Sequence, residues 1–239
     1  MRLDVLALQS FYAGSLGQTA ATMAGRRMVD AWGDCAGLDV MGLGYATPYL
    51  NAWLPTARRV IALMPATQGV ERWPSGGPNL ACIGDEDRMP FQEALFDRIL
   101  CVHALEEAEN PRILLREIWR LLAPEGRLMI MVANRSGVWA RAEANPFGHG
   151  MPYSRSQVAR LLTEAMFQPV AWSRALYGPP LPWSMTTGGA AETWESLGER
   201  AWPALGGVIL VEAVKRLYAD TLPKGGRRVL LAQPARARF

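Results

Sequence analysis

The sequence has few residues of the kinds that build disulfide-rich or metal-dependent proteins. Only three cysteines and two histidines occur among 239 residues. Cys35, Cys82 and Cys101 are odd in number, far apart and set in apolar surroundings. We therefore expect reduced core thiols, no disulfide framework and no metal site.

Long apolar runs are also absent. The sequence contains no uninterrupted apolar stretch long enough to span a bilayer, which takes about 18 residues or more. The first residues, Met1-Arg2-Leu3-Asp4, do not show the basic-then-apolar pattern of a secretory signal. These two absences predict a soluble, cytoplasmic protein with no membrane span.

Most of the chain lacks an excess of positive charge. The net charge is +3, yet residues 224–239 alone hold five basic residues and no acidic one. The rest of the chain is therefore net negative and offers no electrostatic footprint for nucleic acid. We interpret residues 224–239 as a solvated basic tail and do not expect a nucleic-acid partner.

Half of the residues are hydrophobic, which is enough for the core of one large α/β domain over residues 1–223. Strand-like apolar runs alternate with amphipathic segments, a pattern typical of a doubly wound parallel sheet. The expected strands are 38–41, 59–63, 80–83, 98–102, 127–132, 168–176 and 207–215. The expected helices are 3–32, 110–122 and 154–165, and 177–206 reads as a Pro-rich cap insertion with a helix over 190–202.

A glycine turn follows the first expected strand. Gly42-Leu43-Gly44 ends an apolar run and precedes a segment that reads as the start of a helix. Glycine at both positions suits a tight turn whose backbone approaches a ligand. Taken alone, this pattern fits an ordinary strand-to-helix turn equally well.

Several further motifs follow the turn in a fixed order, and with them the sequence resembles class I S-adenosylmethionine-dependent methyltransferases of the type 11 branch. The resemblance covers roughly residues 36–175. It implies a Rossmann-like, seven-stranded sheet with one antiparallel strand, and S-adenosylmethionine as cofactor. The motifs are Gly42-Leu43-Gly44, Gly84-Asp85-Glu86-Asp87-Arg88-Met89-Pro90-Phe91, Phe96-Asp97, Leu105-Glu106 and the segment from Leu114 to Leu128 with Ala123-Pro124-Glu125-Gly126.

The resemblance also implies which residues hold the cofactor. Gly42, Gly44 and the adjoining Tyr45 would face its methionine half, and Asp85 would accept a hydrogen bond from the adenine amino group. Glu86 and Met89 would flank the adenine ring. Cys101 and His103 end the fourth strand, where the family places groups that touch the sulfonium and the substrate.

The sequence departs from the family pattern at the ribose. The second strand should end in an acid that binds both ribose hydroxyls, but Met64 stands there. Val40 replaces a second expected acid, and Glu107 replaces a histidine. The ribose could instead be held by Gln68, or by Tyr12 of the leading helix.

A loop after the fifth strand is rich in functional groups. It carries the expected substrate-facing residues Asn134, Arg135, Trp139, Arg141 and Tyr153, to which we add Tyr12 from the leading helix. His149 in this loop and His103 are candidate general bases for an oxygen or nitrogen nucleophile. The alternative is a loop pinned by its own hydrogen bonds.

These residues predict methyl transfer to a small or medium-sized acceptor by in-line displacement in a closed pocket. Positioning supplies most of the acceleration in such a reaction, so no diagnostic dyad is needed. The alternative is a non-catalytic binding or regulatory protein on the same fold, with a protein partner or a second copy. A third hypothesis is RNA or protein methylation guided by the basic tail.

Overall fold

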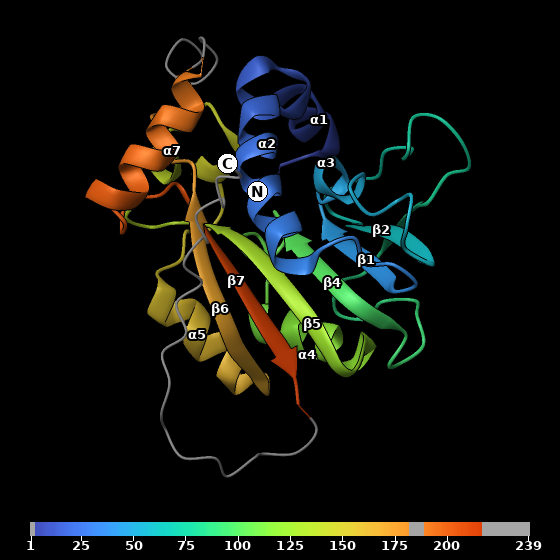
Figure 1. Cartoon of the computed structure of the whole chain (residues 1–239). Helices are drawn as coiled ribbons and strands as arrows, with labels where there is room; N and C mark the ends of the chain where they lie inside the picture. The colour runs from blue at the N-terminus through green and yellow to red at the C-terminus, as the bar shows by residue number, and fades with distance from the viewer. Residues whose placement is uncertain (1–2, 182–188, 217–239) are drawn as a thin grey trace, which may run out of the picture.

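The computed structural model describes residues 3–181 and 189–216, so the predicted tail 224–239 and part of the cap lie outside the described residues. Seven strands of the described chain form one sheet in the order β3-β2-β1-β4-β5-β7-β6 (Figure 1). Within this sheet only β7 runs antiparallel to its neighbours, β5 and β6, which confirms the predicted Rossmann-like sheet. The strands are β1 Asp39–Gly44, β2 Arg59–Pro65, β3 Ala81–Gly84, β4 Phe96–Val102, β5 Leu122–Ala133, β6 Phe167–Ala175 and β7 Val208–Lys215.

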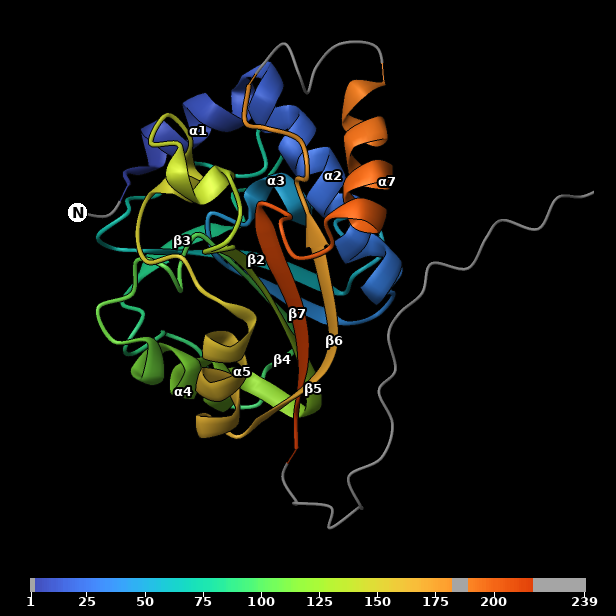
Figure 2. The ribbon, with the colours of Figure 1, turned by 90° about the vertical axis from the view of Figure 1, so that its left-hand side faces the viewer.

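Helices cover both faces of the sheet. In Figure 2, α4 (Pro111–Leu121) and α5 (Arg155–Glu164) lie on one side, and α2 (Ser15–Trp32) and α7 (Ala190–Ala201) lie on the other. Strand alternation divides the core accordingly: in β4, Leu100 and Val102 join the cluster under α2, whereas Ile99 and Cys101 join the cluster under α4 and α5.

The leading helical segment is broken, which corrects the single helix predicted over residues 3–32. Gly14 has extended backbone angles (φ −75°, ψ 159°) and separates α1 (Val5–Ala13) from α2. Gly17 follows closely, and a Cβ there would lie 2.1 Å from the Phe11 carbonyl oxygen. The two glycines therefore allow a sharp, tightly packed corner between α1 and α2.

The helix expected after the glycine turn is reduced to one turn. α3 spans only Thr47–Leu50, and the chain then continues in turns to the start of β2. Pro55 lacks the N–H that a longer helix would need. Between β2 and β3, residues 66–80 also form turns and irregular backbone.

The predicted cap helix is present as α7, and it packs along α2. Three ion pairs join the two helices, with Arg26 bonded to Glu192, and Arg27 close to both Glu195 and Glu199.

Among the described residues, no helix is both long and apolar enough to cross a membrane.

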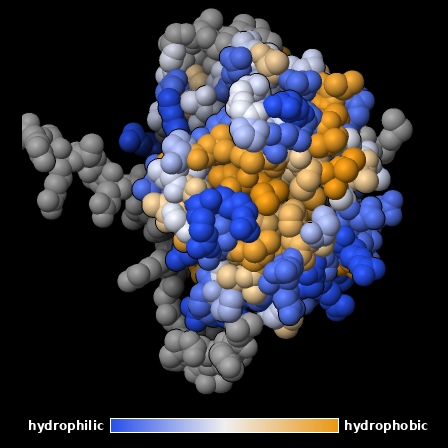
Figure 3. Space-filling view, turned by 90° about the vertical axis from the view of Figure 1, so that its right-hand side faces the viewer, coloured by the Kyte–Doolittle hydropathy of each residue, from blue (hydrophilic) through white to orange (hydrophobic). Residues whose placement is uncertain are grey.

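The outer strand β3 leaves one sheet edge unpaired. Apolar side chains gather on the face that carries this edge (Figure 3). Exposed apolar residues from this part of the chain include Ile83 in β3 and Val70 in the segment after β2, which are 49% and 42% exposed. An exposed apolar edge of this kind is a surface on which another chain can pair.

The start of α4 depends on one side chain. Asn110 precedes the helix, and its Oδ1 accepts hydrogen bonds from the backbone N–H groups of Arg112 and Ile113. We expect Asn110→Ala to lower the free energy of unfolding by about 1 kcal/mol, because these donors lose their partner. Urea unfolding measures the effect, with Glu109→Ala at the adjacent exposed position as the control. Equal stability of the two variants would show that the cap contributes nothing.

Candidate functional site

The predicted glycine turn lies at the carboxyl end of β1, against the end of β4. Gly44 has φ +78°, and a Cβ there would lie 2.2 Å from the Val102 carbonyl oxygen. That oxygen accepts a hydrogen bond from the Tyr45 N–H at 2.9 Å. A Cβ at Gly42 would lie 2.6 Å from the Leu50 side chain. Both glycines are therefore required by the close packing of the protein itself.

Five aromatic side chains fill the space above this turn. Tyr12, Tyr45, Tyr49, His103 and Phe147, here called the edge cluster, are all buried. Tyr12 stacks on Tyr45 with ring centroids 5.5 Å apart, and His103 lies 4.8 Å from Phe147. The Tyr12 hydroxyl is 2.8 Å from His103 Nε2 and 3.1 Å from the Tyr49 hydroxyl. The structure thus brings together Tyr12, Tyr45 and His103, for which the sequence predicts three different roles.

His103 lies at the end of β4 in a left-handed conformation, with φ 50°. Such angles are uncommon for residues other than glycine and concentrate at functional sites. Burial lowers the pKa of the His103 imidazole to about 3. Burial also raises the pKa of the Tyr12 hydroxyl. Both groups are neutral near pH 7, so their contact is a hydrogen bond between uncharged partners.

Glu71 is a carboxylate of this site that no sequence motif indicates. It belongs to the segment after β2 and accepts hydrogen bonds from the Tyr45 hydroxyl at 3.1 Å and the Thr47 hydroxyl at 2.8 Å. These contacts fasten the segment after β2 over the end of β1. No local pattern could mark Glu71, because its partners lie more than 20 residues away in the sequence.

Helix α1 closes the site from above. The backbone N–H of Leu3 donates to the carboxylate of Glu107, and that of Val5 donates to the Gln68 carbonyl at 2.8 Å. Tyr12 provides a third attachment through the edge cluster. Helix α1 therefore crosses the loops that follow β2 and β4, and Glu107, a departure from the family pattern, anchors it.

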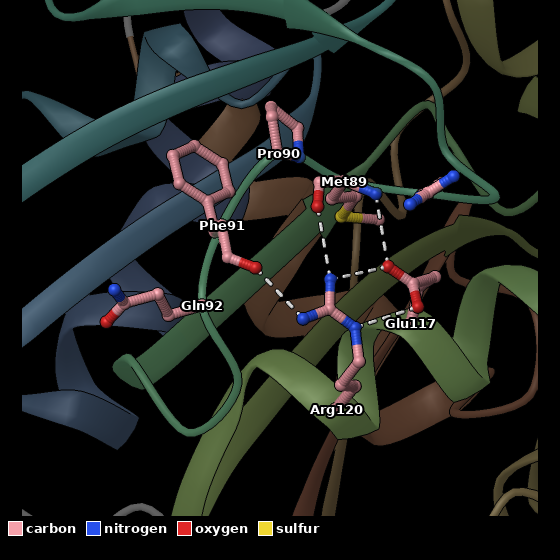
Figure 4. A pocket seen from close by; sticks show the side chains of 7 residues that line it. Met89, Pro90, Phe91, Gln92, Glu117 and Arg120 are labelled. Carbon is pink, nitrogen blue, oxygen red and sulfur yellow. Dashed lines mark hydrogen bonds and ion pairs between the residues drawn. The ribbon is translucent and has the colours of Figure 1, made fainter.

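The expected adenine-side residues lie after β3. Asp85 is exposed, Glu86 is half-buried and Met89 is buried. The Met89 backbone is held from α4: Glu117 accepts from its N–H at 3.1 Å, while Arg120 donates to the carbonyl oxygens of Met89 and Phe91 (Figure 4). The Arg120 guanidinium also lowers the pKa of the Glu117 carboxyl. These contacts fix the shape of the segment between Asp85 and Phe91.

A pocket of about 530 Å³ adjoins this segment, on the side of α4. It is lined by Arg88, Met89, Pro90, Phe91, Gln92, Glu117 and Arg120. Arg120 and Glu117 are bonded to each other and to the backbone around the pocket (Figure 4). Arg120 and Glu117 thus neutralise each other in this lining, whereas the exposed Arg88 adds a positive charge.

Met64 and Cys101 of the predicted site, and Asp39 beside Val40, have different surroundings. Met64 is fully buried at the end of β2. Cys101 is buried in the core on the α4 side of the sheet, so its side chain and the edge cluster lie in different core layers. Asp39 lies at the opposite end of β1, where it forms a two-point ion pair with Arg58.

The loop after β5 is held mainly by hydrogen bonds to neighbouring segments, and in part by hydrogen bonds within the loop. Asn134 Nδ2 donates to the carbonyl oxygens of Ala204 and Gly206, and Trp139 Nε1 donates to that of Gly178. Tyr153 is buried with its hydroxyl on the Leu105 carbonyl, and His149 Nε2 lies 2.9 Å from the Glu143 carbonyl oxygen. Arg135 and Arg141 are exposed. Of the two candidate bases, His103 belongs to the edge cluster, whereas His149 bonds within its own loop.

The low pKa of His103 gives a direct spectroscopic prediction. We expect its ring signals in nuclear magnetic resonance spectra to stay at the neutral position between pH 8 and pH 5, because the folded pKa is about 3. The unfolded chain, with a histidine pKa of about 6.5, binds a proton that the folded chain does not. This residue therefore favours folding above about pH 6.5 and progressively less as the pH falls toward the folded pKa.

The second histidine is removed by His149→Asn so that the signal is assigned without ambiguity. A titration midpoint between pH 5 and pH 8 in that variant would contradict the buried, neutral state of His103.

Comparison with known proteins agrees with this architecture. Residues 38–130 match the methyltransferase domain family. No curated protein matches the sequence. Among solved structures, the methyltransferase in the complex with the Haloferax volcanii methyltransferase activator Trm112 is 18% identical, with a TM-score of 0.62 over 88% of this chain and 98% of that chain.

Two further structures share the fold. The S-adenosylmethionine-dependent methyltransferase of Thermotoga maritima is 14% identical, with a TM-score of 0.59 over 87% of this chain and 94% of that chain. The one from Mesorhizobium loti is 15% identical, with a TM-score of 0.57 over 84% and 98%. Residues 38–130 therefore match a methyltransferase domain, and the strand order is that of the class I S-adenosylmethionine-dependent methyltransferase fold.

Proposed function

We propose that the protein transfers a methyl group from S-adenosylmethionine to the oxygen or nitrogen nucleophile of a small or medium-sized acceptor. The observation that carries this proposal is the edge cluster, which gathers polar aromatic side chains over the Gly42–Gly44 turn. In open α/β sheets, ligands bind at the carboxyl ends of the strands, where this cluster lies. A base with an uncharged imidazole, His103, is part of it.

One observation in particular indicates that the residues at this edge fit the cofactor. Both polar atoms of the Gln68 side chain, just beyond β2, are buried without a hydrogen-bond partner. Gly42, Gly44 and Tyr45 would hold the methionine half, while Asp85, Glu86 and Met89 would hold the adenine. Met64 would contact the ribose as an apolar neighbour. When bound, S-adenosylmethionine supplies a methyl group that its sulfonium has already activated.

Entry of the cofactor requires α1 to move. The edge cluster packs Tyr12 directly on Tyr45, so the space above the glycine turn is occupied by side chains. α1 is attached there by backbone contacts at Leu3 and Val5 and by the Tyr12 hydroxyl. A hinge is available at Gly14, where the backbone is extended and the next helix begins. We propose that α1 opens at Gly14 and closes again over the bound molecules, which keeps water from the reaction.

Movement of α1 would also change His103. With the bound molecules between α1 and the strand ends, the imidazole would no longer contact Tyr12, and its weaker burial would raise its pKa toward the ordinary value, where it can accept a proton from the acceptor. Without ligands, the Tyr12 hydroxyl bonds to the ring instead. His149 and the exposed Arg135 and Arg141 lie on the loop after β5, where they could contact a larger acceptor.

The remaining domain boundaries are part of the same proposal. Residues 1–223 would form a single catalytic domain, with 177–206 as a cap. The α7 helix of that cap adds to the wall on the α2 side. Because the Haloferax volcanii relative was solved with an activator protein, a protein partner or a second copy of this chain is included in the proposal.

A second candidate function is non-catalytic binding on the methyltransferase fold. Two observations favour it. Met64 places a fully buried apolar side chain where the family has a ribose-binding acid, and apolar side chains, Ile83 of β3 among them, are exposed on the face that carries the β3 edge (Figure 3). Such a protein would use the exposed edge and would bind the cofactor weakly or not at all.

Calorimetry with S-adenosylmethionine and S-adenosylhomocysteine separates the two functions. We expect binding by the wild-type protein, and a loss of about tenfold in affinity for Asp85→Ala, which removes one hydrogen bond to the adenine. Asp87→Ala, at an exposed position two residues away, is the matched control and should bind as the wild type does. Absence of heat with millimolar ligand and a folded wild-type protein would exclude the enzyme.

Turnover is tested with methyl-labelled cofactor and a metabolite extract, in which the labelled product identifies the acceptor. With that acceptor, we expect His103→Gln to lower kcat by about a hundredfold, as for loss of a general base. Its affinity for S-adenosylhomocysteine should change far less, because the imidazole contributes to proton transfer. An unchanged kcat would remove His103 from the mechanism and direct attention to His149.

A further inference from the structure

The Gln68 side chain is the most exceptional buried polar group in the described part of the chain. The residue is 1% exposed, and neither Oε1 nor Nε2 has a hydrogen-bond partner. Every other described side chain with a buried, unpaired polar atom has just one such atom. Buried groups of this kind are unfavourable in a folded protein, so each calls for a ligand or water that satisfies it.

Local backbone structure places Gln68 over the end of β2. Its N–H donates to the Pro65 carbonyl oxygen at 2.9 Å, which closes a turn directly after the strand. The next N–H, that of Gly69, donates to the same oxygen at 3.2 Å. The Gln68 carbonyl accepts from Val5 at the start of α1. Gln68 therefore lies between the end of β2 and the helix that closes the site.

The sheet order indicates which part of the cofactor this position would face. β2 lies between β1, which carries the glycine turn, and β3, which leads into Asp85. A molecule with its methionine half over Gly44 and its adenine beside Asp85 has its ribose over the end of β2. The last two residues of the strand, Met64 and Pro65, are both apolar.

Other polar groups near this edge are already engaged. The Tyr12 hydroxyl is bonded to His103 and Tyr49, and the Glu71 carboxylate accepts from Tyr45 and Thr47. Using Tyr12 for the ribose would break existing hydrogen bonds, whereas each Glu71 oxygen keeps one further lone pair while it holds Tyr45 and Thr47. The Gln68 amide requires no such exchange, because both of its atoms are unpaired.

We propose that Gln68 binds the ribose hydroxyls of S-adenosylmethionine, in place of the acid that Met64 has replaced. Oε1 accepts a hydrogen bond from one hydroxyl, and Nε2 donates to the oxygen of a hydroxyl. The recognition is therefore neutral where the family uses a charged group. This inference rests on the proposed function, since it assigns one residue to the cofactor site described there.

Calorimetry with S-adenosylhomocysteine and its 2′-deoxy and 3′-deoxy analogues tests the assignment on the full-length protein. The wild type is expected to bind the parent compound about tenfold more tightly than at least one of the two analogues, because a hydroxyl partner of Gln68 is missing. Gln68→Leu should bind S-adenosylhomocysteine about tenfold more weakly than the wild type does. This variant should bind S-adenosylhomocysteine and that analogue equally well. The control is Gln168→Leu, an exposed glutamine on β6 at the opposite edge of the sheet, which should behave as the wild type.

Thermal unfolding without ligand separates a ligand-binding role from a structural one. Gln68→Leu should unfold at the same temperature as the wild type or higher, because an unpaired amide is replaced by an apolar group of similar size. Should the leucine variant fail to fold, Gln68→Asn, which keeps the amide one methylene shorter, is expected to reduce the discrimination against the same analogue.

The outcomes separate this inference from the proposed function. If the wild type binds S-adenosylhomocysteine and the Gln68 variants keep both the affinity and the discrimination, the role of Gln68 is overturned and the methyltransferase proposal stands. If the folded wild type binds none of the three compounds, the proposed function is overturned and this inference with it.

Discussion

The close approach of the β1 turn to the end of β4 is the constraint on which the site depends. Gly44 adopts φ +78° with its Cα against the Val102 carbonyl, and the Tyr45 N–H bonds to that same oxygen. This contact brings Tyr45 next to His103, the residue after Val102. A side chain on Gly44 would push the two strand ends apart, and the edge cluster could not form.

The edge cluster has apolar rings that favour burial and polar atoms that need hydrogen-bond partners, and these two requirements act against each other in a binding site. Burial of five aromatic rings stabilises the closed state, since each contributes apolar area and favourable ring geometry. The polar atoms of the same rings must then bond to one another, as Tyr12 does with His103 and Tyr49. The result is a site that is satisfied when closed by α1, apart from the Gln68 amide at its margin. A ligand would have to compete with Tyr12 and satisfy that amide.

Local sequence patterns predicted the strands well because most of them, such as β1, β2 and β4, contain a buried apolar run between turn residues, although β5 is longer than expected and β6 is only partly buried. The segment Ala123-Pro124-Glu125-Gly126 also stops α4, as expected, although β5 already begins at Leu122. One expectation about helices was wrong for a local reason that the periodicity of apolar residues does not record: Gly14 divides the leading helix. The helix start expected after the glycine turn is present as the single turn α3, which packs against α2 and β2.

The candidate site was less predictable than the fold because its contacts join residues far apart in the chain. The loop after β5 looked functional from its residue types, yet Asn134, Trp139 and Tyr153 mostly hold the loop to its neighbours. Glu71 had no local signature, and it fastens the segment after β2. The sequence by itself determined the Rossmann-like sheet and the methyltransferase type, since both follow from motifs that recur in a fixed order. Tertiary structure alone decided that Tyr12 covers His103 and that Gln68 is buried without a partner, because these depend on where α1 crosses the sheet edge.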